Sequence, residues 1–265
     1  MAKLTVLITG ASRGIGLTTA KKLASKGHNV GLFDIDVTEL ESAIKDKAFK
    51  KAIGSKSIAH GNLDVTNPED WDSAIAEMND KFGGIDVLIN NAGILVTGNL
   101  PDSQLSAQLK LVDINCKGVL VGCHKIASQM TGGEHHKIIN LSSASAIYGQ
   151  PEIAPYSASK FFVRGLTEAL NIEFEPKGIK VVDVMPLWVQ TDMTKGVKVT
   201  SIDRLGLNLT PNDVAKVLYK LATSPNAKLH KTHYPVGMPA KLLNSLAQLS
   251  PSVSMTRLFN KVVGA

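Results

Sequence analysis

The stretch LTVLITGASRGIG, residues 4–16, joins a short apolar run to a glycine-rich turn. The β-branched and apolar residues 4–9 predict a buried strand, and the helical period of residues 14–26 predicts a helix directly after the turn. Glycines let the backbone turn sharply and approach a ligand closely. The N-terminus of the helix offers free N–H groups and a positive dipole end to a pyrophosphate. The turn is therefore predicted to hold a dinucleotide.

The same alternation of short apolar runs and helical segments continues along the chain. The strands are expected at 4–9, 29–33, 57–62, 87–90, 136–141, 180–185 and 232–236. The helices are expected at 14–26, 36–50, 68–82, 102–131, 155–176 and 211–223. Repeated βαβ units predict an α/β fold: a Rossmann-type, doubly wound parallel sheet of about seven strands with helices on both faces.

One domain over residues 1–265 is expected, because no linker, internal repeat or low-complexity tract interrupts the pattern. Two segments lie outside it. The polar stretch at about 190–210 is predicted to be a substrate lid. The C-terminal extension at about 240–265 has apolar residues at helical spacing, interrupted by Pro251, which favours packing in the core or between subunits over a role at a membrane surface or as a substrate cover.

The composition excludes several classes of protein. The net charge of +6 and pI of about 9.2 come from interspersed lysines and acids without aromatic residues among them, so no nucleic-acid partner is predicted. No signal peptide and no membrane span are expected, because the apolar runs are too short, and we expect a cytoplasmic protein. Cys116 and Cys123 are expected to be reduced thiols, and neither they nor His135 and His136 suggest a metal site.

Asp34 ends the second expected strand, eighteen residues after Gly16. A carboxylate there can accept hydrogen bonds from both adenosine ribose hydroxyls and would repel a 2′-phosphate, which favours NAD over NADP. Arg13 argues the other way, since a guanidinium could hold that phosphate, and NADP stays possible. We give more weight to the repulsion between Asp34 and a 2′-phosphate at contact range than to the attraction of an exposed Arg13. Asp36 is interpreted as a helix N-cap.

Tyr156 and Lys160 stand four residues apart at the start of an expected helix, in YSASK at 156–160. That spacing puts the phenol and the ammonium group on one helix face. The lysine charge, joined by that of an oxidised nicotinamide, is expected to lower the tyrosine pKa and make Tyr156 a usable base. The pair alone carries little information, because it arises often by chance.

Ser143 follows the fifth expected strand, thirteen residues before Tyr156. A hydroxyl at the carboxyl edge of a parallel sheet can donate to a substrate oxygen while the tyrosine moves the proton. Ser142 is the alternative, and spacing favours Ser143. A hydrolase is excluded because the Gly-x-Ser-x-Gly elbow is absent. Asn115, placed inside the long expected helix at 102–131, suggests a kink or a bound water.

These segments together resemble the short-chain dehydrogenase/reductase family from about Leu4 to about Met193. The resemblance rests on TGASRGIG at 9–16, Asp34, Asp64-Val65, NNAG at 90–93, Asn115, Ser143, YSASK, and Pro186 with Thr191, all in the family's order. It implies a catalytic tetrad of Asn115, Ser143, Tyr156 and Lys160. It also implies a homodimer or homotetramer built on helix pairs that include 102–131 and 155–176.

Within this resemblance each residue has an expected role. Tyr156 exchanges the proton, Ser143 polarises the substrate oxygen, Lys160 binds the nicotinamide ribose, and Asn115 holds a water of the proton relay. The expected cofactor contacts are Gly10, Ser12, Arg13, Gly14, Ile15, Gly16, Asp34, Asp64, Val65, Asn91, Ala92, Gly93, Tyr156, Lys160, Pro186, Val189 and Thr191. The chain departs from the family at Leu187 and Trp188, where a glycine usually follows the proline.

The predicted function is hydride transfer between NAD(H) and a secondary alcohol or ketone. An apolar small-molecule substrate is expected, because apolar residues gather around the presumed site: Ala144, Ala146, Ile147, Ile153, Leu187 and Trp188. The alternative is a catalytically silent NAD(H)-binding regulator. A complete set of catalytic residues argues against that alternative.

Overall fold

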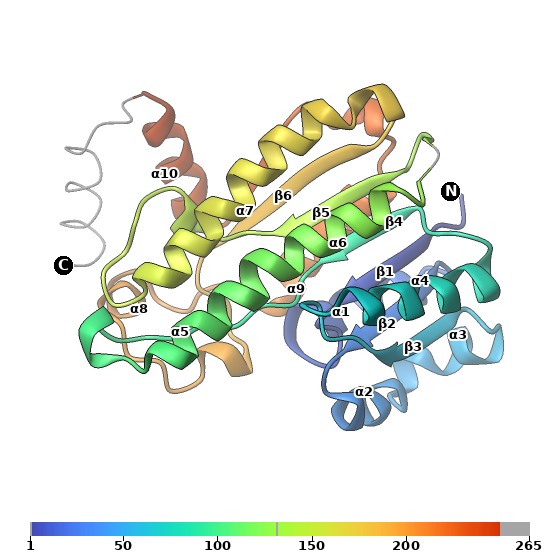
Figure 1. Cartoon of the computed structure of the whole chain (residues 1–265), viewed down its shortest axis with the longest axis horizontal. Coiled ribbons are helices and arrows are strands. Elements are labelled where there is room, and N and C mark those ends of the chain that lie inside the picture. Colours follow the sequence, from blue (N-terminus) through green and yellow to red (C-terminus); the bar gives the residue numbers. More distant parts are fainter. Residues whose placement is uncertain (1, 131, 250–265) are drawn as a thin grey trace.

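A computed structural model describes residues 2–130 and 132–249 of the chain (Figure 1). Seven strands form one sheet in the order β3-β2-β1-β4-β5-β6-β7, and every neighbouring pair is parallel. The strands are β1 (Thr5–Thr9), β2 (Asn29–Asp34), β3 (Ile58–Asn62), β4 (Val87–Asn90), β5 (Lys137–Leu141), β6 (Lys180–Pro186) and β7 (His233–Val236). The predicted doubly wound parallel sheet is confirmed.

The strand order reverses direction between β1 and β4. The chain starts at β1 in the middle of the sheet, moves outward to β3, and returns to lay β4 on the other side of β1. Ligands of open α/β sheets bind where the order reverses, outside the carboxyl ends of the strands. The glycine-rich turn after β1 lies at that point.

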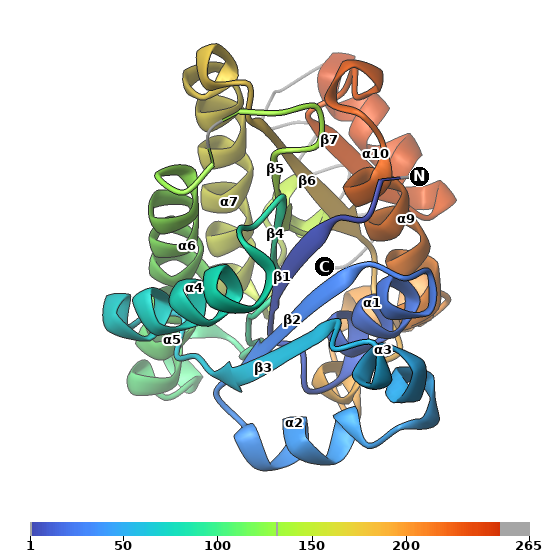
Figure 2. The same cartoon turned by 90° about the vertical axis from the view of Figure 1, so that its right-hand side faces the viewer.

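Helices cover both faces of the sheet (Figure 2). They are α1 (Gly14–Ser25), α2 (Val37–Ile44), α3 (Lys50–Gly54), α4 (Pro68–Phe82), α5 (Leu105–Val112), α6 (Gly118–Ala127), α7 (Ala154–Glu173), α8 (Thr200–Leu205), α9 (Pro211–Thr223) and α10 (Met238–Leu249). α1 packs beside α9 on one face, and α4 lies beside α6 on the other. The alternating side chains of β1 serve both layers, since Val6 and Ile8 join the core under α1 and α9 while Leu7 joins the core under α4 and α6.

Two predicted helices are interrupted. The run 36–50 divides into α2, a single 3₁₀ turn and α3, because the Asp46 carboxylate accepts a hydrogen bond from the backbone N–H of Ala48 at 2.8 Å and caps a new turn. The run 102–131 divides into α5 and α6 around a π-helical turn, Asp113–Lys117. Asn115, where a kink or a bound water was expected, lies inside this π-helical turn.

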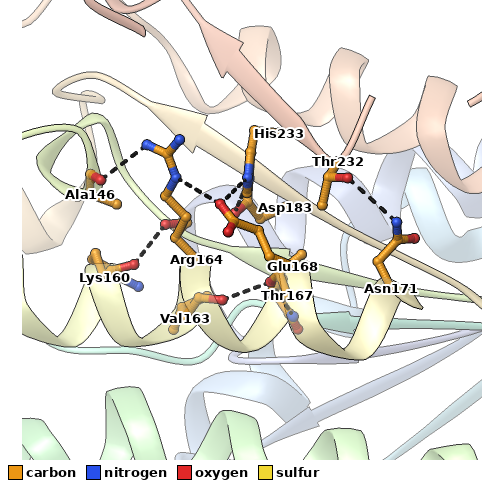
Figure 3. Close-up of polar contacts among 12 residues, drawn as sticks. Ala146, Lys160, Val163, Arg164, Thr167, Glu168, Asn171, Asp183, Thr232 and His233 are labelled. Carbon is orange, nitrogen blue, oxygen red and sulfur yellow. Dashed lines mark hydrogen bonds and ion pairs between the residues drawn. The ribbon is translucent and has the colours of Figure 1, made fainter. Parts of the chain in front are cut away.

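Polar contacts fasten α7 to the far edge of the sheet (Figure 3). His233 of β7 places Nδ1 2.9 Å from the buried Asp183 carboxylate of β6 and Nε2 2.7 Å from Glu168 of α7. Arg164 donates to Glu168 and, at 3.3 Å, to the carbonyl oxygen of Ala146. Burial lowers the pKa of His233, but hydrogen bonds and charge from Asp183 and Glu168 outweigh it and raise that pKa. The imidazolium form alone donates to both carboxylates.

Candidate active site

The glycine-rich turn is shaped by contacts that leave no room for side chains. Gly10 has a φ of +63°, and a Cβ atom there would lie 2.8 Å from the Cα atom of Ala92. A Cβ atom on Gly16 would clash with the carbonyl oxygen of Gly10. Asn91 donates its side-chain amide to the carbonyl oxygens of Thr9 and Gly10, at 2.9 and 2.8 Å. The turn therefore packs against the residues that follow β4. Its backbone remains available to a ligand at the start of α1.

Asp34 is buried at the end of β2, and both of its carboxylate oxygens accept backbone hydrogen bonds. One accepts from Ser12 at 2.9 Å and the other from Asp36 at 3.0 Å. Arg13 is exposed and lies 3.3 Å from the carboxylate of Asp36. Asp36 caps α2 by accepting from the backbone N–H of Glu39, as predicted. Asp34 thus faces the glycine-rich turn with a fixed carboxylate.

A cavity of about 520 Å³ runs along the carboxyl edge of the sheet. The predicted residues that line it are Gly10, Arg13, Gly14, Ile15, Asp34, Asp64, Val65, Asn91, Ala92, Gly93, Ser143, Tyr156, Pro186, Val189 and Thr191. Four predicted residues lie behind its wall: Ser12, Gly16, Asn115 and Lys160. The sequence did not reveal Ile35 and Leu63, which follow β2 and β3, or Ile114 in the π-helical turn as lining residues, because a single apolar residue does not differ from a core residue in sequence.

Tyr156 and Ser143 meet at this cavity. Burial raises the pKa of Tyr156 to about 12, although a hydrogen bond with Ser143 acts in the opposite direction. The Lys160 ammonium nitrogen lies 5.5 Å from the centre of the tyrosine ring. The expected lowering of the tyrosine pKa is therefore not a property of the chain alone, in which desolvation of the phenolate outweighs the effects that favour it.

Lys160 and Asn115 support the tyrosine from inside the fold. Lys160 donates to the carbonyl oxygen of Leu141 at 2.8 Å, and burial lowers the pKa of its ammonium group to about 8. The Asn115 side chain exchanges two hydrogen bonds with the backbone of Ile94, both at 2.9 Å, and donates to Ser159 at 3.2 Å. Asn115 therefore joins the segment after β4 to α7, which carries the tyrosine.

The end of the cavity beyond Tyr156 is mainly apolar. Ala144, Ile153, Leu187 and Trp188 line it, as expected from the sequence. The expectation is wrong for Ala146 and Ile147: both are buried and neither lines the cavity. The reason is the 3₁₀ turn Ala144–Ala146, which ends before Ile147 and directs that side chain into a core cluster with other apolar residues, among them Met185 and Leu243.

The segment after β6 also lines the cavity. Met193 and Thr194 line the cavity, and α8 follows them. The Glu152 carboxylate accepts from the backbone N–H of Thr200, the first residue of α8, at 2.7 Å. The Trp188 indole donates to the hydroxyl of Ser201 at 3.2 Å. These two contacts attach α8 to the loop before α7 and to the segment after β6.

Two further findings concern the described part of the chain. No group of three or more His, Cys, Asp or Glu side chains is arranged there to hold a metal ion. No helix between residues 2 and 249 is both long and apolar enough to cross a membrane.

Comparison with known proteins decides the family. A sequence model described as short chain dehydrogenase matches residues 4–201. The chain belongs to the short-chain dehydrogenase/reductase family. As a family member it is an NAD(P)-dependent oxidoreductase that transfers a hydride between the nicotinamide and an alcohol or carbonyl carbon. The silent regulator is not favoured.

Similar proteins within the family act on different compounds. The chain is 32% identical over 222 residues to a 3-alpha-(or 20-beta)-hydroxysteroid dehydrogenase of Mycobacterium bovis, covering 83% of each. It is 37% identical over 188 residues to an L-2,3-butanediol dehydrogenase of Corynebacterium glutamicum, covering 71% of this chain and 72% of that one. The crystal structure of a 3-ketoacyl-(acyl-carrier-protein) reductase from Brucella melitensis complexed with NADH superimposes with a TM-score of 0.77, at 29% identity, covering 88% of this chain and 96% of that one.

Proposed function

We propose that this short-chain dehydrogenase/reductase interconverts a secondary alcohol and its ketone with NAD(H), and that Tyr156 exchanges the proton with the substrate oxygen. The observation that carries the proposal is that Tyr156 and Ser143 line the same cavity, with the Lys160 ammonium nitrogen 5.5 Å from the centre of the phenol ring. The apolar residues beyond this pair support a substrate with an apolar body.

The residues present fit a dinucleotide. The turn at Gly10 and Gly16 has no side chains where a pyrophosphate would meet the start of α1, and the buried hydroxyl of Ser12 has no hydrogen-bond partner in the described chain. The dinucleotide, when bound, donates or accepts the hydride. The chain holds it with the predicted cavity-lining residues and excludes water with its apolar wall.

The proton is handled by the chain's own side chains. Because the pKa of Tyr156 lies well above neutral pH, its hydroxyl is protonated and can donate to a ketone oxygen during reduction, while Ser143 donates a second hydrogen bond to the same oxygen. In oxidation the phenol must first lose its proton, and the nearby Lys160 ammonium group favours that loss. Asn115 holds α7 against the segment after β4 through its hydrogen bonds to Ile94 and Ser159. It also supports a water-mediated exit for the proton.

The remaining predictions form part of the same proposal. The fixed Asp34 carboxylate favours NAD. The exposed Arg13 guanidinium does not outweigh this preference, because it is already paired with the Asp36 carboxylate. The stretch at about 190–210 acts as the substrate lid of a single domain. We also propose a cytoplasmic homodimer or homotetramer built on α5, α6 and α7, and no nucleic-acid partner.

Replacing Tyr156 with Phe tests the proposal. The change should lower kcat by about 10²- to 10⁴-fold, the range lost with a general acid or base, and leave NADH affinity nearly unchanged. Nicotinamide absorbance measures turnover, and NADH fluorescence measures binding. Tyr219→Phe is the matched control, because Tyr219 is outside the cavity and also loses one hydroxyl. Retained activity in Tyr156→Phe would refute the proposed role.

A further inference from the structure

Two buried polar side chains beside the reacting pair have atoms with no hydrogen-bond partner. Ser145 is 2% exposed and Gln150 is 6% exposed, and both line the cavity. The Ser145 hydroxyl oxygen and the Gln150 amide oxygen find no partner in the described chain. A buried unpaired polar group costs about 1–3 kcal/mol, and because both atoms are closed off from the open cavity, each side chain must turn to pair with a ligand there.

The backbone of each residue is tied to a neighbour of the reacting groups. The N–H of Ser145 donates to the hydroxyl of Ser143 at 3.2 Å. The N–H of Gln150 donates at 3.2 Å to the hydroxyl of Ser157, the residue directly after Tyr156. These bonds place the backbone of each residue close to the reacting pair, and both residues line the same cavity as Ser143 and Tyr156.

The surroundings make these two side chains distinctive. The other residues at that end of the cavity are mostly apolar and include Ile94, Leu95, Ala144, Ile153, Leu187 and Trp188. In such a pocket a few placed polar groups set the orientation and identity of the ligand. A serine hydroxyl both donates and accepts, and a glutamine amide offers a carbonyl oxygen and two N–H donors. Together they match a hydroxyl or a carbonyl oxygen.

We propose that Ser145 and Gln150 form a subsite for a second oxygen of the substrate, on the carbon next to the reacting carbon or one further along. The inference rests on the proposed function and narrows its substrate class to diols and hydroxyketones with an otherwise apolar body. The serine reaches the second oxygen by rotation about χ1, and the glutamine by rotation of its terminal amide. The hydride transfer itself is unchanged: a diol is oxidised to a hydroxyketone while NAD is reduced and one proton is released.

Matched pairs of substrates test the inference on the unaltered protein. The values of kcat/KM are compared for trans-1,2-cyclohexanediol against cyclohexanol, and for 2,3-butanediol against 2-butanol. The subsite predicts a preference of at least about tenfold for each diol, because the mono-alcohol leaves the buried polar groups unpaired. Equal values for diol and mono-alcohol would overturn the inference and leave the proposed function standing.

Two variants identify the residues responsible. Ser145→Ala and Gln150→Leu should each lower kcat/KM for the diols by about tenfold and leave the mono-alcohols within about twofold. Gln129→Leu, an exposed change after α6, is the control and should alter neither. A parallel loss for diols and mono-alcohols would indicate a general structural role and contradict the subsite. NADH affinity and melting temperature show whether each variant is folded, and the substrate comparison on the unaltered protein decides the inference if one is not.

The two proposals fail in distinguishable ways. If neither alcohols nor ketones of either kind are turned over, the proposed function fails and the subsite fails with it. If mono-alcohols react as well as diols, only the subsite is refuted.

Discussion

Asp34 ends β2 with its carboxylate fixed by the backbone N–H groups of Ser12 and Asp36. A carboxylate held in this way cannot turn aside to admit a second negative charge. A 2′-phosphate at the ribose would therefore meet it at contact range, and the repulsion would act against NADP.

Asp34→Asn removes this charge and keeps the shape and one acceptor oxygen. We expect the ratio of NADPH affinity to NADH affinity to rise by at least about tenfold, or about 1.4 kcal/mol. Fluorescence titration with both dinucleotides measures the ratio. Asp36→Asn is the control, since asparagine also caps helices and the same unit of charge is lost nearby. A similar rise of the ratio in both variants would show that the total negative charge near the ribose, rather than Asp34 itself, sets the preference for NADH over NADPH.

The sequence predicted the position of single site residues where the chemistry requires a particular side chain, at the end of a strand or at the start of α7. Asp34, Ser143 and Tyr156 line one cavity as their order along the chain suggested. Gly16 and Ser12 lie behind its wall: a Cβ atom on Gly16 would clash with the carbonyl oxygen of Gly10, and Ser12 is buried. A sequence motif does not separate residues that touch a ligand from those that shape the turn around it.

The Glu152 contact gives α8 a definite attachment to the loop before the catalytic helix. The bond joins a carboxylate to the backbone N–H of Thr200, and hydrogen bonds to charged groups contribute about 1.5–3 kcal/mol. If α8 is the lid, closing it over the substrate depends on this N–H group.

Thr200→Pro deletes that N–H group at a position where proline fits. Thr200 begins the helix, and Val199 before it is extended, with φ −138° and ψ 143°. We expect KM for the substrate to rise by about tenfold while NADH affinity stays unchanged. Thr200→Ala keeps the N–H group and should resemble the unaltered protein in steady-state kinetics. Equal effects from both changes would mean that the side chain, not the N–H group, matters.

At the level of elements, all seven strands were predicted to within a residue or so, because apolar runs bounded by turns are local signals. The π turn at Asp113–Lys117 was not predicted, since Asn115 suggested only a kink or a bound water. Its cause is a pair of hydrogen bonds between Asn115 and Ile94, twenty-one residues apart. Periodicity within one segment cannot reveal a contact with another.

The helices α5, α6 and α7 are neighbours in one layer of the molecule (Figure 1). Each of them carries exposed apolar side chains. They include Leu105 and Leu109 on α5, Leu120 on α6, and Phe161 and Ile172 on α7. Burying them between subunits is the simplest way to remove them from water, in line with the proposed homo-oligomer.

Leu109→Glu should dissociate that assembly. Leu109 is 56% exposed in the single chain, so the change costs the monomer little, but a charge buried between subunits is expensive. Sedimentation velocity should show a shift from the oligomer to the monomer. Ile53→Glu, at a 49% exposed site on α3, is the matched control and should leave the assembly intact. An unchanged sedimentation coefficient in Leu109→Glu would contradict the proposed interface.

The cavity draws its walls from both sides of the point where the strand order reverses. Gly10 and Asp34 come from the first half of the chain, and Tyr156 and Thr191 come from the second. On the ribosome, a growing chain thus has no complete binding site until the segment past β6 has emerged. Because both halves line one cavity, a dinucleotide bound there would stabilise the folded molecule as a unit, by an amount that grows with the logarithm of its concentration.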